Sequence, residues 1–359
     1  MSETIKAAGT KAVGETVLTV NNLKISFRTY GGLVQAVRGI NFDLKRGETV
    51  AVVGESGSGK SVSVKAIMGI LTKNAIIESG EIHYDGKDLT KVEEDDFHKI
   101  RGNKIGMIFQ DPLSALNPIM KIGKQITEVL KLAKNMNANE ARDKALELMN
   151  AVGIPEAERR FNQYPFQFSG GMRQRIVIAI ALAGDPEILI CDEPTTALDV
   201  TVQAKILDLI NQIKRDRNLS VIFITHDLGV VANMADRVNV MYAGKIVESG
   251  TSEDVFFRPA HPYTWALLSS LPDLQTKERL LSISGTPPNM IYPPPGDAFS
   301  VRSRYAMKID FEMEPPMFKI SDTHYAATWL LHPKAIKPEL PAVLQARINR
   351  MRESGRINV

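Results

Sequence analysis

The chain has 359 residues, of which 44% are hydrophobic, so it is long enough to bury two cores and we expect a soluble globular protein. The 44 Lys and Arg residues nearly balance the 41 Asp and Glu residues, and the resulting net charge of +3 is too small to attract nucleic acid or anionic lipid strongly; we expect no nucleic-acid partner. The single cysteine, Cys191, excludes an internal disulfide and any metal site built from several cysteines, and it is typical of a reducing compartment.

The first 16 residues are polar and small, and we expect them to form a flexible N-terminus. They lack the apolar stretch that a signal peptide requires. No run in the sequence approaches the roughly 18 apolar residues that are needed to span a bilayer. If this protein works at a membrane, other chains must therefore hold it there.

Residues 17–258 alternate short β-branched runs with amphipathic helical patterns, which predicts an α/β domain with a largely parallel sheet. Buried strands are predicted at 49–53, 105–109, 188–191 and 221–224. Between the second and third of these strands, residues of about 122–182 have apolar side chains at helical spacing and predict a helical insertion.

The composition changes near Arg258, because most of the 19 prolines lie further on and argue against long regular elements there. We therefore expect a small irregular extension over 259–335. The tail, 336–359, is a predicted helix that carries Arg347, Arg350, Arg352 and Arg356. It could contact lipid headgroups or a partner, or be a solvated terminal helix.

A phosphate-binding loop is predicted directly after the strand that ends at Val53. The residues that fit the pattern G-x-x-x-x-G-K-[ST] are Gly54, Glu55, Ser56, Gly57, Ser58, Gly59, Lys60 and Ser61, and a helical pattern from Val62 to Leu71 follows. Glycines let backbone N–H groups turn inward around phosphates, and the following helix presents its positive end to the same anion. Lys60 is expected to reach the β- and γ-phosphates and the Ser61 hydroxyl to ligate Mg²⁺.

Polar residues also end three other predicted strands. Asp192 and Glu193 follow the strand 188–191, and alternation along a strand aims them differently. Asp192 suits a Mg²⁺ site and Glu193 suits a general base that polarises the attacking water, although acidic residues at strand ends are often only solvated. His226 is a candidate contact to the γ-phosphate, and Gln110 could orient water or complete the Mg²⁺ shell.

Five motifs, taken in order, resemble those of ATP-binding cassette (ABC) ATPases over roughly residues 18–255. They are GESGSGKS, Gln110, FSGGMRQ, ILICDEPTTALD and Thr225-His226-Asp227. The resemblance implies a P-loop NTPase with a RecA-like core, an antiparallel β subdomain and a helical subdomain. It implies two bound ATP molecules, with Mg²⁺, in a head-to-tail dimer. It assigns Ser169, Gly170 and Gly171 to the ATP of the opposite subunit and Asp199 to communication across the dimer.

Two details of this resemblance concern single side chains. Met172 stands where the family has a glutamine, which removes one amide hydrogen-bonding group. An aromatic residue before the first strand normally stacks on adenine in the family. Phe27 fits the spacing best and Tyr30 is the alternative, while Phe27 could instead be a core residue that stacks on nothing.

The sequence PAHPYTWALLSSLPDL, residues 259–274, together with the later GTPPNM, resembles the extension of oligopeptide and dipeptide importer ATPases, and most closely the D-type subunit of the oligopeptide permease. The resemblance implies a peripheral protein at the cytoplasmic face of the bacterial membrane. Its partners would be a homologous F-type ATPase, two transmembrane permease subunits and, indirectly, an extracellular peptide-binding protein. Alternatives are an importer ATPase for another solute, such as dipeptides or nickel chelates, and a regulatory or repair ABC ATPase without a membrane partner.

Many D-type extensions hold an iron–sulfur cluster on four cysteines, and the resemblance places four other residues at those positions. They are Asp297, Ser303, Asp310 and Thr328. Carboxylates and hydroxyls are hard donors, whereas the cluster needs thiolates, so we predict no iron–sulfur cluster. The two carboxylates could ligate Ca²⁺ or Mg²⁺ instead, or hydrogen bonds and the packing of Phe299, Tyr305, Met307, Trp329 and Leu330 could hold this segment without metal.

Overall fold

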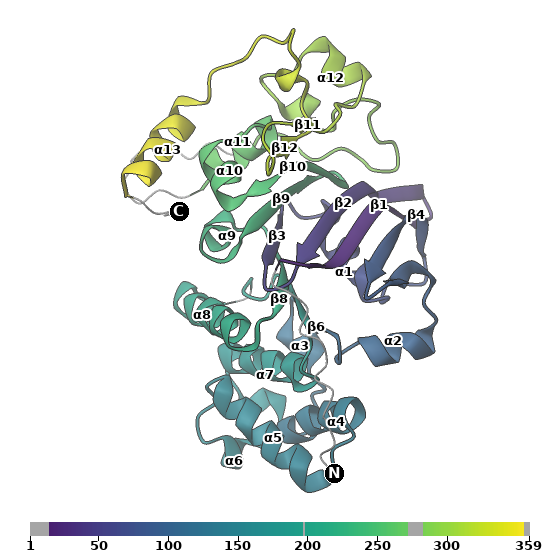
Figure 1. Cartoon of the computed structure of the whole chain (residues 1–359), viewed down its shortest axis with the longest axis vertical. Helices are drawn as coiled ribbons and strands as arrows, with labels where there is room; N and C mark the ends of the chain where they lie inside the picture. Colours follow the sequence, from purple (N-terminus) through teal and green to yellow (C-terminus); the bar gives the residue numbers. More distant parts are fainter. Residues whose placement is uncertain (1–13, 197, 272–282, 355–359) are drawn as a thin grey trace, which may run out of the picture.

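The computed structural model describes residues 14–196, 198–271 and 283–354 of the chain. Four parts of the predictions lie outside these residues. They are most of the flexible N-terminus, Ala197 of the ALD motif, the last part of the 259–274 match and Arg356 of the tail. The described chain folds into a long molecule with a mixed sheet at its centre, a helical region at one end and the extension at the other (Figure 1).

The central sheet is largely parallel, as predicted. Its eight strands in the described residues have the order β11-β12-β10-β9-β3-β8-β7-β6, and the pairs β9/β3, β3/β8, β8/β7 and β7/β6 are parallel. Its cassette strands are β3 (Thr49–Val53), β6 (Ile105–Ile108), β7 (Ile188–Asp192), β8 (Ser220–Thr225), β9 (Arg237–Tyr242) and β10 (Lys245–Thr251). Every residue of β3, β6, β7 and β8 is buried, because helices or a second sheet cover both faces.

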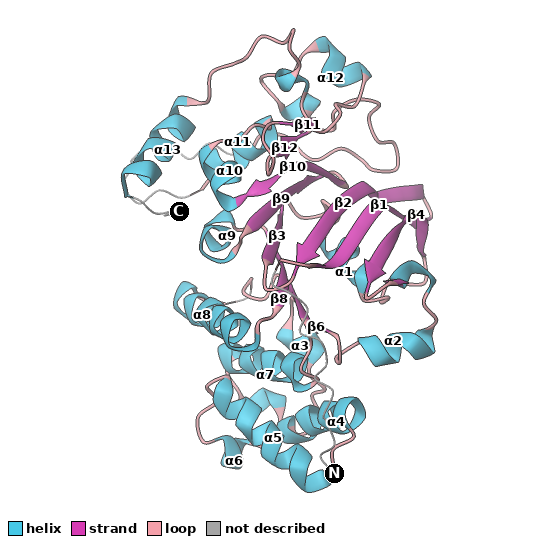
Figure 2. Ribbon diagram, in the orientation of Figure 1, coloured by secondary structure: helices cyan, strands magenta, loops and turns pink. Residues whose placement is uncertain are grey.

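A second, antiparallel sheet has the order β2-β1-β4-β5 and lies beside the first (Figure 2). Its strands are β1 (Thr16–Thr29), β2 (Gly32–Lys45), β4 (Ala75–Tyr84) and β5 (Lys87–Asp88). Its inner face shares one core with α1 (Lys60–Ile67) and α2 (Glu94–Ile100). The phosphate-binding helix α1 therefore lies between the two sheets.

The predicted helical insertion is a bundle whose core is continuous with one face of the central sheet. It consists of α3 (Pro112–Ala115), α4 (Ile122–Lys134), α5 (Ala138–Ala151), α6 (Ala157–Arg160) and α7 (Gly170–Ala183). Apolar residues of α4, α5 and α7 share a cluster with β6, β7 and α8 (Val200–Arg217). Because α7 contacts both the bundle and the sheet, it connects the two parts.

The extension continues the central sheet and core. Its elements are α11 (Pro262–Ser269), α12 (Lys308–Glu312), β11 (Phe318–Lys319), β12 (Tyr325–Ala326) and α13 (Ala342–Ser354), and α9 (Leu228–Met234) and α10 (Ser252–Phe257) precede it. β12 pairs with β10, and Tyr263, Phe299 and Leu344 are buried in one cluster with Val53 and Val238. The extension is thus packed directly on the strand that leads to the phosphate loop.

The tail helix α13 is packed against the extension rather than solvated on all sides. Leu344, Ile348 and Met351 are buried in the shared core. Arg347 is also buried, and its guanidinium donates to the Leu268 and Leu271 carbonyls at 2.5 Å. This arginine therefore holds the tail to the end of α11.

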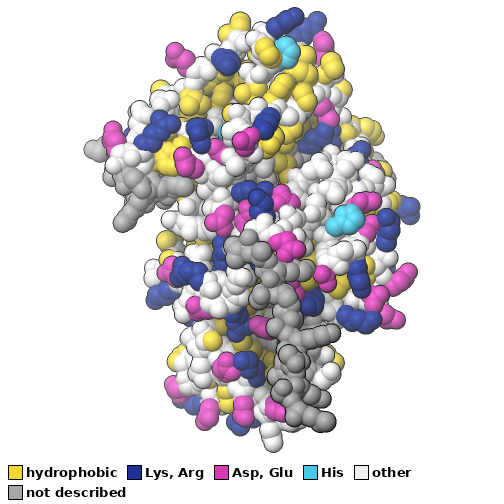
Figure 3. Space-filling view, viewed as in Figure 1, with side chains coloured by type: hydrophobic (Ala, Val, Ile, Leu, Met, Phe, Trp, Pro, Cys, Tyr) yellow, Lys and Arg dark blue, Asp and Glu magenta, His cyan; other side chains and the backbone are white. Residues whose placement is uncertain are grey.

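Among the described residues, no helix is long and apolar enough to cross a membrane. Exposed apolar side chains do gather over the extension, at the top of Figure 3. The exposed large apolar residues of this region are Tyr292, Val301, Phe311, Met313, Met317, Ile320 and Ile336.

Candidate active site

The phosphate loop joins β3 to α1, the arrangement that the motif predicts. Gly54 has a φ of 153°, and a Cβ there would lie 2.0 Å from the Met241 carbonyl oxygen, so no side chain fits. Gly59 has a φ of 103°, and a Cβ there would lie 2.5 Å from the Ala36 carbonyl oxygen. Close backbone neighbours and a left-handed φ thus both require glycine at these positions.

Lys60 lies beside the loop and already holds it together. Its Nζ donates to the Gly54 carbonyl at 2.7 Å and to the Glu55 carbonyl at 2.9 Å. Burial lowers the pKa of Lys60, and the nearby carboxylates of Glu193, Asp192 and Glu55 act in the opposite direction. The ammonium is therefore placed where the phosphates of a nucleotide would compete for its hydrogen bonds.

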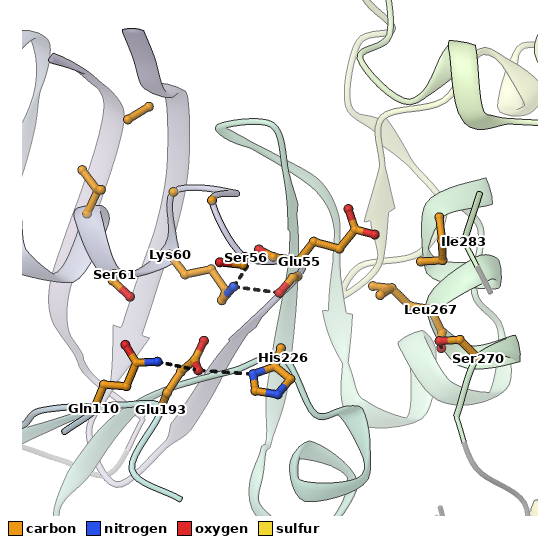
Figure 4. Close-up of a pocket in the computed structure, with 15 residues that line it drawn as sticks. Glu55, Ser56, Lys60, Ser61, Gln110, Glu193, His226, Leu267, Ser270 and Ile283 are labelled. Atoms are coloured by element: carbon orange, nitrogen blue, oxygen red, sulfur yellow. Dashed lines mark hydrogen bonds and ion pairs between the residues drawn. The ribbon is translucent and has the colours of Figure 1, made fainter. Parts of the chain in front are cut away.

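A cavity of about 770 Å³ opens beside the loop, and most of the predicted nucleotide residues line it. Figure 4 shows Lys60, Ser61, Gln110, Glu193 and His226 gathered on one side of this cavity. The lining also includes Gly54, Glu55, Ser56, Gly57, Gly59, Val62 and Ala36, together with Leu267, Ser270 and Ile283 of the extension. Of the predicted loop residues, Ser58 is buried and is not part of the lining.

Ser61 and Asp192, two of the predicted Mg²⁺ ligands, are in contact. The Ser61 hydroxyl donates to Asp192 Oδ1 at 2.7 Å, and burial raises the pKa of Asp192. Among the described residues there is no group of three or more His, Cys, Asp or Glu side chains that could hold a metal. A serine hydroxyl beside one carboxylate nevertheless fits Mg²⁺, which often takes one or two protein ligands and completes its shell with phosphates and water.

Glu193 has different partners from Asp192, as the alternation along the strand predicts. Its Oε2 accepts hydrogen bonds from Gln110 Nε2 at 3.2 Å and from the Thr196 hydroxyl at 2.9 Å, and His226 Nδ1 lies 3.2 Å away. Thr196, which lies three residues after Glu193 in the same motif, was not predicted from the sequence. The Glu193 backbone has a φ of 48°, a left-handed conformation that turns the chain sharply after β7.

The two aromatic residues proposed to stack on adenine, Phe27 and Tyr30, do not line the cavity. Phe27 is half-buried and packs on the core between the two sheets, and Tyr30 is exposed. Neither residue lines the cavity, whose apolar walls come from Ala36 and Val62 and from Leu267 and Ile283 of the extension. Stacking by Phe27 stays a prediction that this arrangement does not support.

The signature residues lie away from this chain's own cavity. Ser169 caps α7, where its hydroxyl accepts the Met172 N–H at 3.4 Å, and Ser169 and Gly170 are exposed. None of Ser169, Gly170 and Gly171 is among the residues that line the cavity. Asp199 caps α8 by accepting the Val202 N–H at 3.0 Å, so it has a local structural role whatever its role across a dimer.

The extension contacts the phosphate loop through residues that the sequence analysis did not assign to it. The Tyr263 hydroxyl accepts the Glu55 N–H at 2.8 Å, and Arg302 binds the Glu55 carboxylate with two hydrogen bonds of 2.7 and 2.9 Å. Because Arg302 is 247 residues away from Glu55 in the chain, no local pattern could have predicted this pair.

The four residues at the cysteine positions each accept a nearby backbone N–H. Asp297 accepts from Phe299 at 2.9 Å, Ser303 from Tyr305 at 3.2 Å, Asp310 from Met307 at 2.6 Å and Thr328 from Leu330 at 3.3 Å. The Asp297 N–H also donates to the Asp310 carbonyl at 2.7 Å. Local hydrogen bonds of this kind stabilise turns, and the adjacent Phe299 and Leu330 are buried in the shared core. This geometry supports the metal-free alternative for this segment.

Two family models match the chain. The model described as "ABC transporter" matches residues 37–196, and the model described as "Oligopeptide/dipeptide transporter, C-terminal region" matches residues 247–309. The chain is 57% identical to the oligopeptide transport ATP-binding protein OppD of Bacillus subtilis (strain 168), over 93% of this chain and 94% of the relative. It is 56% identical to the dipeptide transport ATP-binding protein DppD of Lactococcus lactis subsp. cremoris (strain MG1363), over 94% of this chain and 98% of the relative.

Solved structures of ATP-binding cassettes have a similar fold. A dimeric structure of a post-hydrolysis state of the ATP-binding cassette MJ0796, bound to ADP and Pi, superposes with a TM-score of 0.60 at 29% identity and covers 66% of this chain and 99% of that chain. A structure of cbiO1 from Clostridium perfringens, part of the transporter complex cbiONQ, has a TM-score of 0.58 at 28% identity and covers 68% of this chain and 92% of that chain.

Proposed function

Because this chain belongs to the ABC transporter family, in its group of oligopeptide and dipeptide transport ATP-binding proteins, we propose that it hydrolyses ATP with Mg²⁺ to power the import of oligopeptides. One observation carries the proposal. The relative named for oligopeptide transport matches 93% of the chain, which includes both the cassette and the extension.

We expect the site residues to have different roles in phosphoryl transfer. Lys60 and the N–H groups of the loop hold the phosphates, and Ser61 and Asp192 would hold Mg²⁺, which neutralises phosphate charge when it is bound. Glu193 accepts the proton of the attacking water, and Gln110, Thr196 and His226 orient its carboxylate toward the cavity. Catalysis then depends mainly on positioning and on charge, as is usual for this reaction.

The position of the signature residues supports the proposed assembly. Ser169 and Gly171 do not line this chain's own cavity, so they are free to complete the ATP site of a homologous F-type ATPase in a head-to-tail heterodimer. Glycine N–H groups at a helix start are suited to bind the γ-phosphate there. We place this pair beneath two transmembrane permease subunits at the cytoplasmic face of the bacterial membrane, with an extracellular peptide-binding protein as the source of substrate.

Dipeptides are a second candidate substrate, because the relative named for dipeptide transport is almost as similar as the one named for oligopeptides. The residues that select peptide length would lie in the other chains of the transporter. The substrate therefore has to be measured on the complete assembly.

The proposal is tested by affinity purification of the tagged chain from its native membranes in mild detergent. We expect recovery of two polytopic membrane proteins and a second cassette ATPase, and an ATPase activity that peptide-loaded binding protein stimulates. Peptides of two to five residues, supplied singly, then distinguish dipeptide from oligopeptide transport. Recovery of the chain alone, with no membrane partner, would favour a cassette that does not transport.

A further inference from the structure

Glu55, the second residue of the phosphate loop, connects the extension to the loop lysine. Its backbone N–H donates to the Tyr263 hydroxyl at 2.8 Å, and its carboxylate accepts two hydrogen bonds from Arg302. Its carbonyl oxygen accepts the Lys60 ammonium at 2.9 Å. Glu55 therefore contacts both the Arg302 guanidinium of the extension and the Lys60 ammonium that would bind phosphate.

Arg302 is held firmly in this position. Its side chain is only 3% exposed. Besides Glu55, its guanidinium donates to the Tyr242 hydroxyl at 3.0 Å and to the Ser284 carbonyl at 2.8 Å. A buried, paired guanidinium–carboxylate contact has a fixed geometry, because both groups are planar and the two hydrogen bonds are parallel. The contact therefore restricts where the Glu55 backbone can lie.

The charge of Glu55 makes this contact important for ATP. Glu55 lines the same cavity as Lys60 and Ser61, and a carboxylate without a partner there would repel a bound polyphosphate. The Arg302 guanidinium neutralises that carboxylate and holds it on the side of the extension. In Figure 4 the Glu55 side chain points away from Lys60. Leu267, Ser270 and Ile283 of the extension also form part of the cavity wall.

We propose that Arg302 is a positioning residue of the ATP site, through which the extension fixes the phosphate loop and neutralises its acidic residue. The inference rests on the proposed function, since it assumes that the cavity binds ATP. The extension of this chain then forms part of the nucleotide-binding machinery in the same subunit. By thermodynamic linkage, bound ATP should stabilise the Arg302–Glu55 contact to the same extent as the contact favours ATP.

The test measures the ATP affinity of the purified full-length chain by fluorescence titration with a labelled ATP, in the presence of Mg²⁺. Arg302→Met leaves the Glu55 charge unpaired beside the phosphates, and we expect the dissociation constant to rise by roughly tenfold. Glu55→Gln removes the carboxylate charge but also weakens the paired contact with Arg302, so we expect a loss of affinity that is smaller than that of Arg302→Met. The double variant should bind ATP more tightly than Arg302→Met, because it no longer has an unpaired carboxylate beside the phosphates.

A purely structural role would give a different pattern. If the double variant binds ATP as weakly as Arg302→Met, or if Arg302→Met binds like the wild type, the inference is overturned. Arg304→Met is the matched control, because Arg304 is exposed and lies two residues along the same segment. We expect wild-type affinity for this control.

A conservative variant covers the case in which Arg302→Met does not fold. Arg302→Lys keeps the positive charge but cannot make the paired contact, and we expect an affinity between those of the wild type and Arg302→Met. Wild-type affinity in a folded Arg302→Lys variant would overturn the positioning role. If the wild-type chain itself binds no ATP, the proposed function fails; if it binds ATP and the variants do not differ, only the role of Arg302 fails.

Discussion

His226 Nδ1 lies 3.2 Å from Glu193 Oε2, at the ends of the neighbouring strands β8 and β7. The same oxygen accepts hydrogen bonds from Gln110 and Thr196. One carboxylate oxygen thus receives polar groups from three separate segments of the chain. This convergence is what a positioned general base requires, because its orientation has to be set before the water is attacked.

Replacing this base should stop the chemistry without affecting binding. In Glu193→Gln the amide still accepts a hydrogen bond but cannot take a proton, so we expect ATP affinity near that of the wild type and a loss of at least about 100-fold in kcat. Single-turnover hydrolysis of radiolabelled ATP and a parallel binding titration measure the two effects. Glu158→Gln, an exposed change in α6, is the control. Wild-type turnover in Glu193→Gln would refute the assignment of the base.

Thr196 should contribute less than Glu193, because it only orients the carboxylate. Thr196→Val removes the 2.9 Å hydrogen bond while keeping the shape of the side chain. One hydrogen bond has a net value of about 0.5–1.5 kcal/mol, so we expect kcat to fall by roughly threefold to tenfold with little change in KM. Thr201→Val, at an exposed position of α8, is the matched control. Equal rates in the two variants would show that Thr196 does not orient the base.

Metal removal should abolish hydrolysis, and Asp192 should set the concentration of Mg²⁺ that is needed. Excess EDTA is expected to stop ATP hydrolysis, and added Mg²⁺ to restore it. Asp192→Asn keeps an acceptor for the Ser61 hydroxyl but removes the negative charge, so half-maximal activity should need roughly tenfold more Mg²⁺. An unchanged Mg²⁺ titration in this variant would place the cation elsewhere. The exposed Asp216→Asn variant in α8 controls for the loss of one charge.

Asp297 should make the protein less stable as the pH rises. Burial raises the pKa of Asp297 to about 6, above its ordinary value in an unfolded chain of about 4. The folded state therefore binds this proton more tightly than the unfolded state, and the stabilisation is complete below about pH 4 and is lost as the pH rises through 6.

The variant Asp297→Asn measures this effect. Its amide oxygen can still accept the Phe299 N–H, and no buried charge forms at high pH. At pH 7.5 the free energy of unfolding should exceed that of the wild type by about 1–3 kcal/mol, and the difference should shrink as the pH falls toward 4. Urea unfolding of both proteins at several pH values checks this. A difference that does not depend on pH would mean that Asp297 does not titrate in this range.

The iron content tests the segment around Asp297 in a second way. The four residues at the cysteine positions are hard donors that already make local hydrogen bonds; they are Asp297, Ser303, Asp310 and Thr328. Anaerobically purified protein should therefore contain neither iron nor acid-labile sulfide in stoichiometric amounts. Stoichiometric amounts of both would refute this prediction.

The sequence by itself determined the cassette and its chemical groups, because these depend on short segments. Four buried strands, the helical insertion and the loop Gly54–Ser61 follow from local periodicity and from residue types at fixed spacing. The partnership of Ser61 with Asp192 was also within reach. Ser61 follows β3 and Asp192 ends β7, and these parallel strands flank β8, so their carboxyl ends lie at the same edge of the sheet.

Only the tertiary structure decided which residues complete the cavity. Phe27, the predicted adenine contact, is half-buried against the core, and Leu267 and Ile283 of the extension supply part of the apolar wall of the cavity. The contact of Arg302 with Glu55 joins residues 247 positions apart, and it forms because β12 pairs with β10 and a shared core draws the extension onto the phosphate loop. Pairings at such separations depend on how whole elements pack, and no local pattern in a single sequence records them.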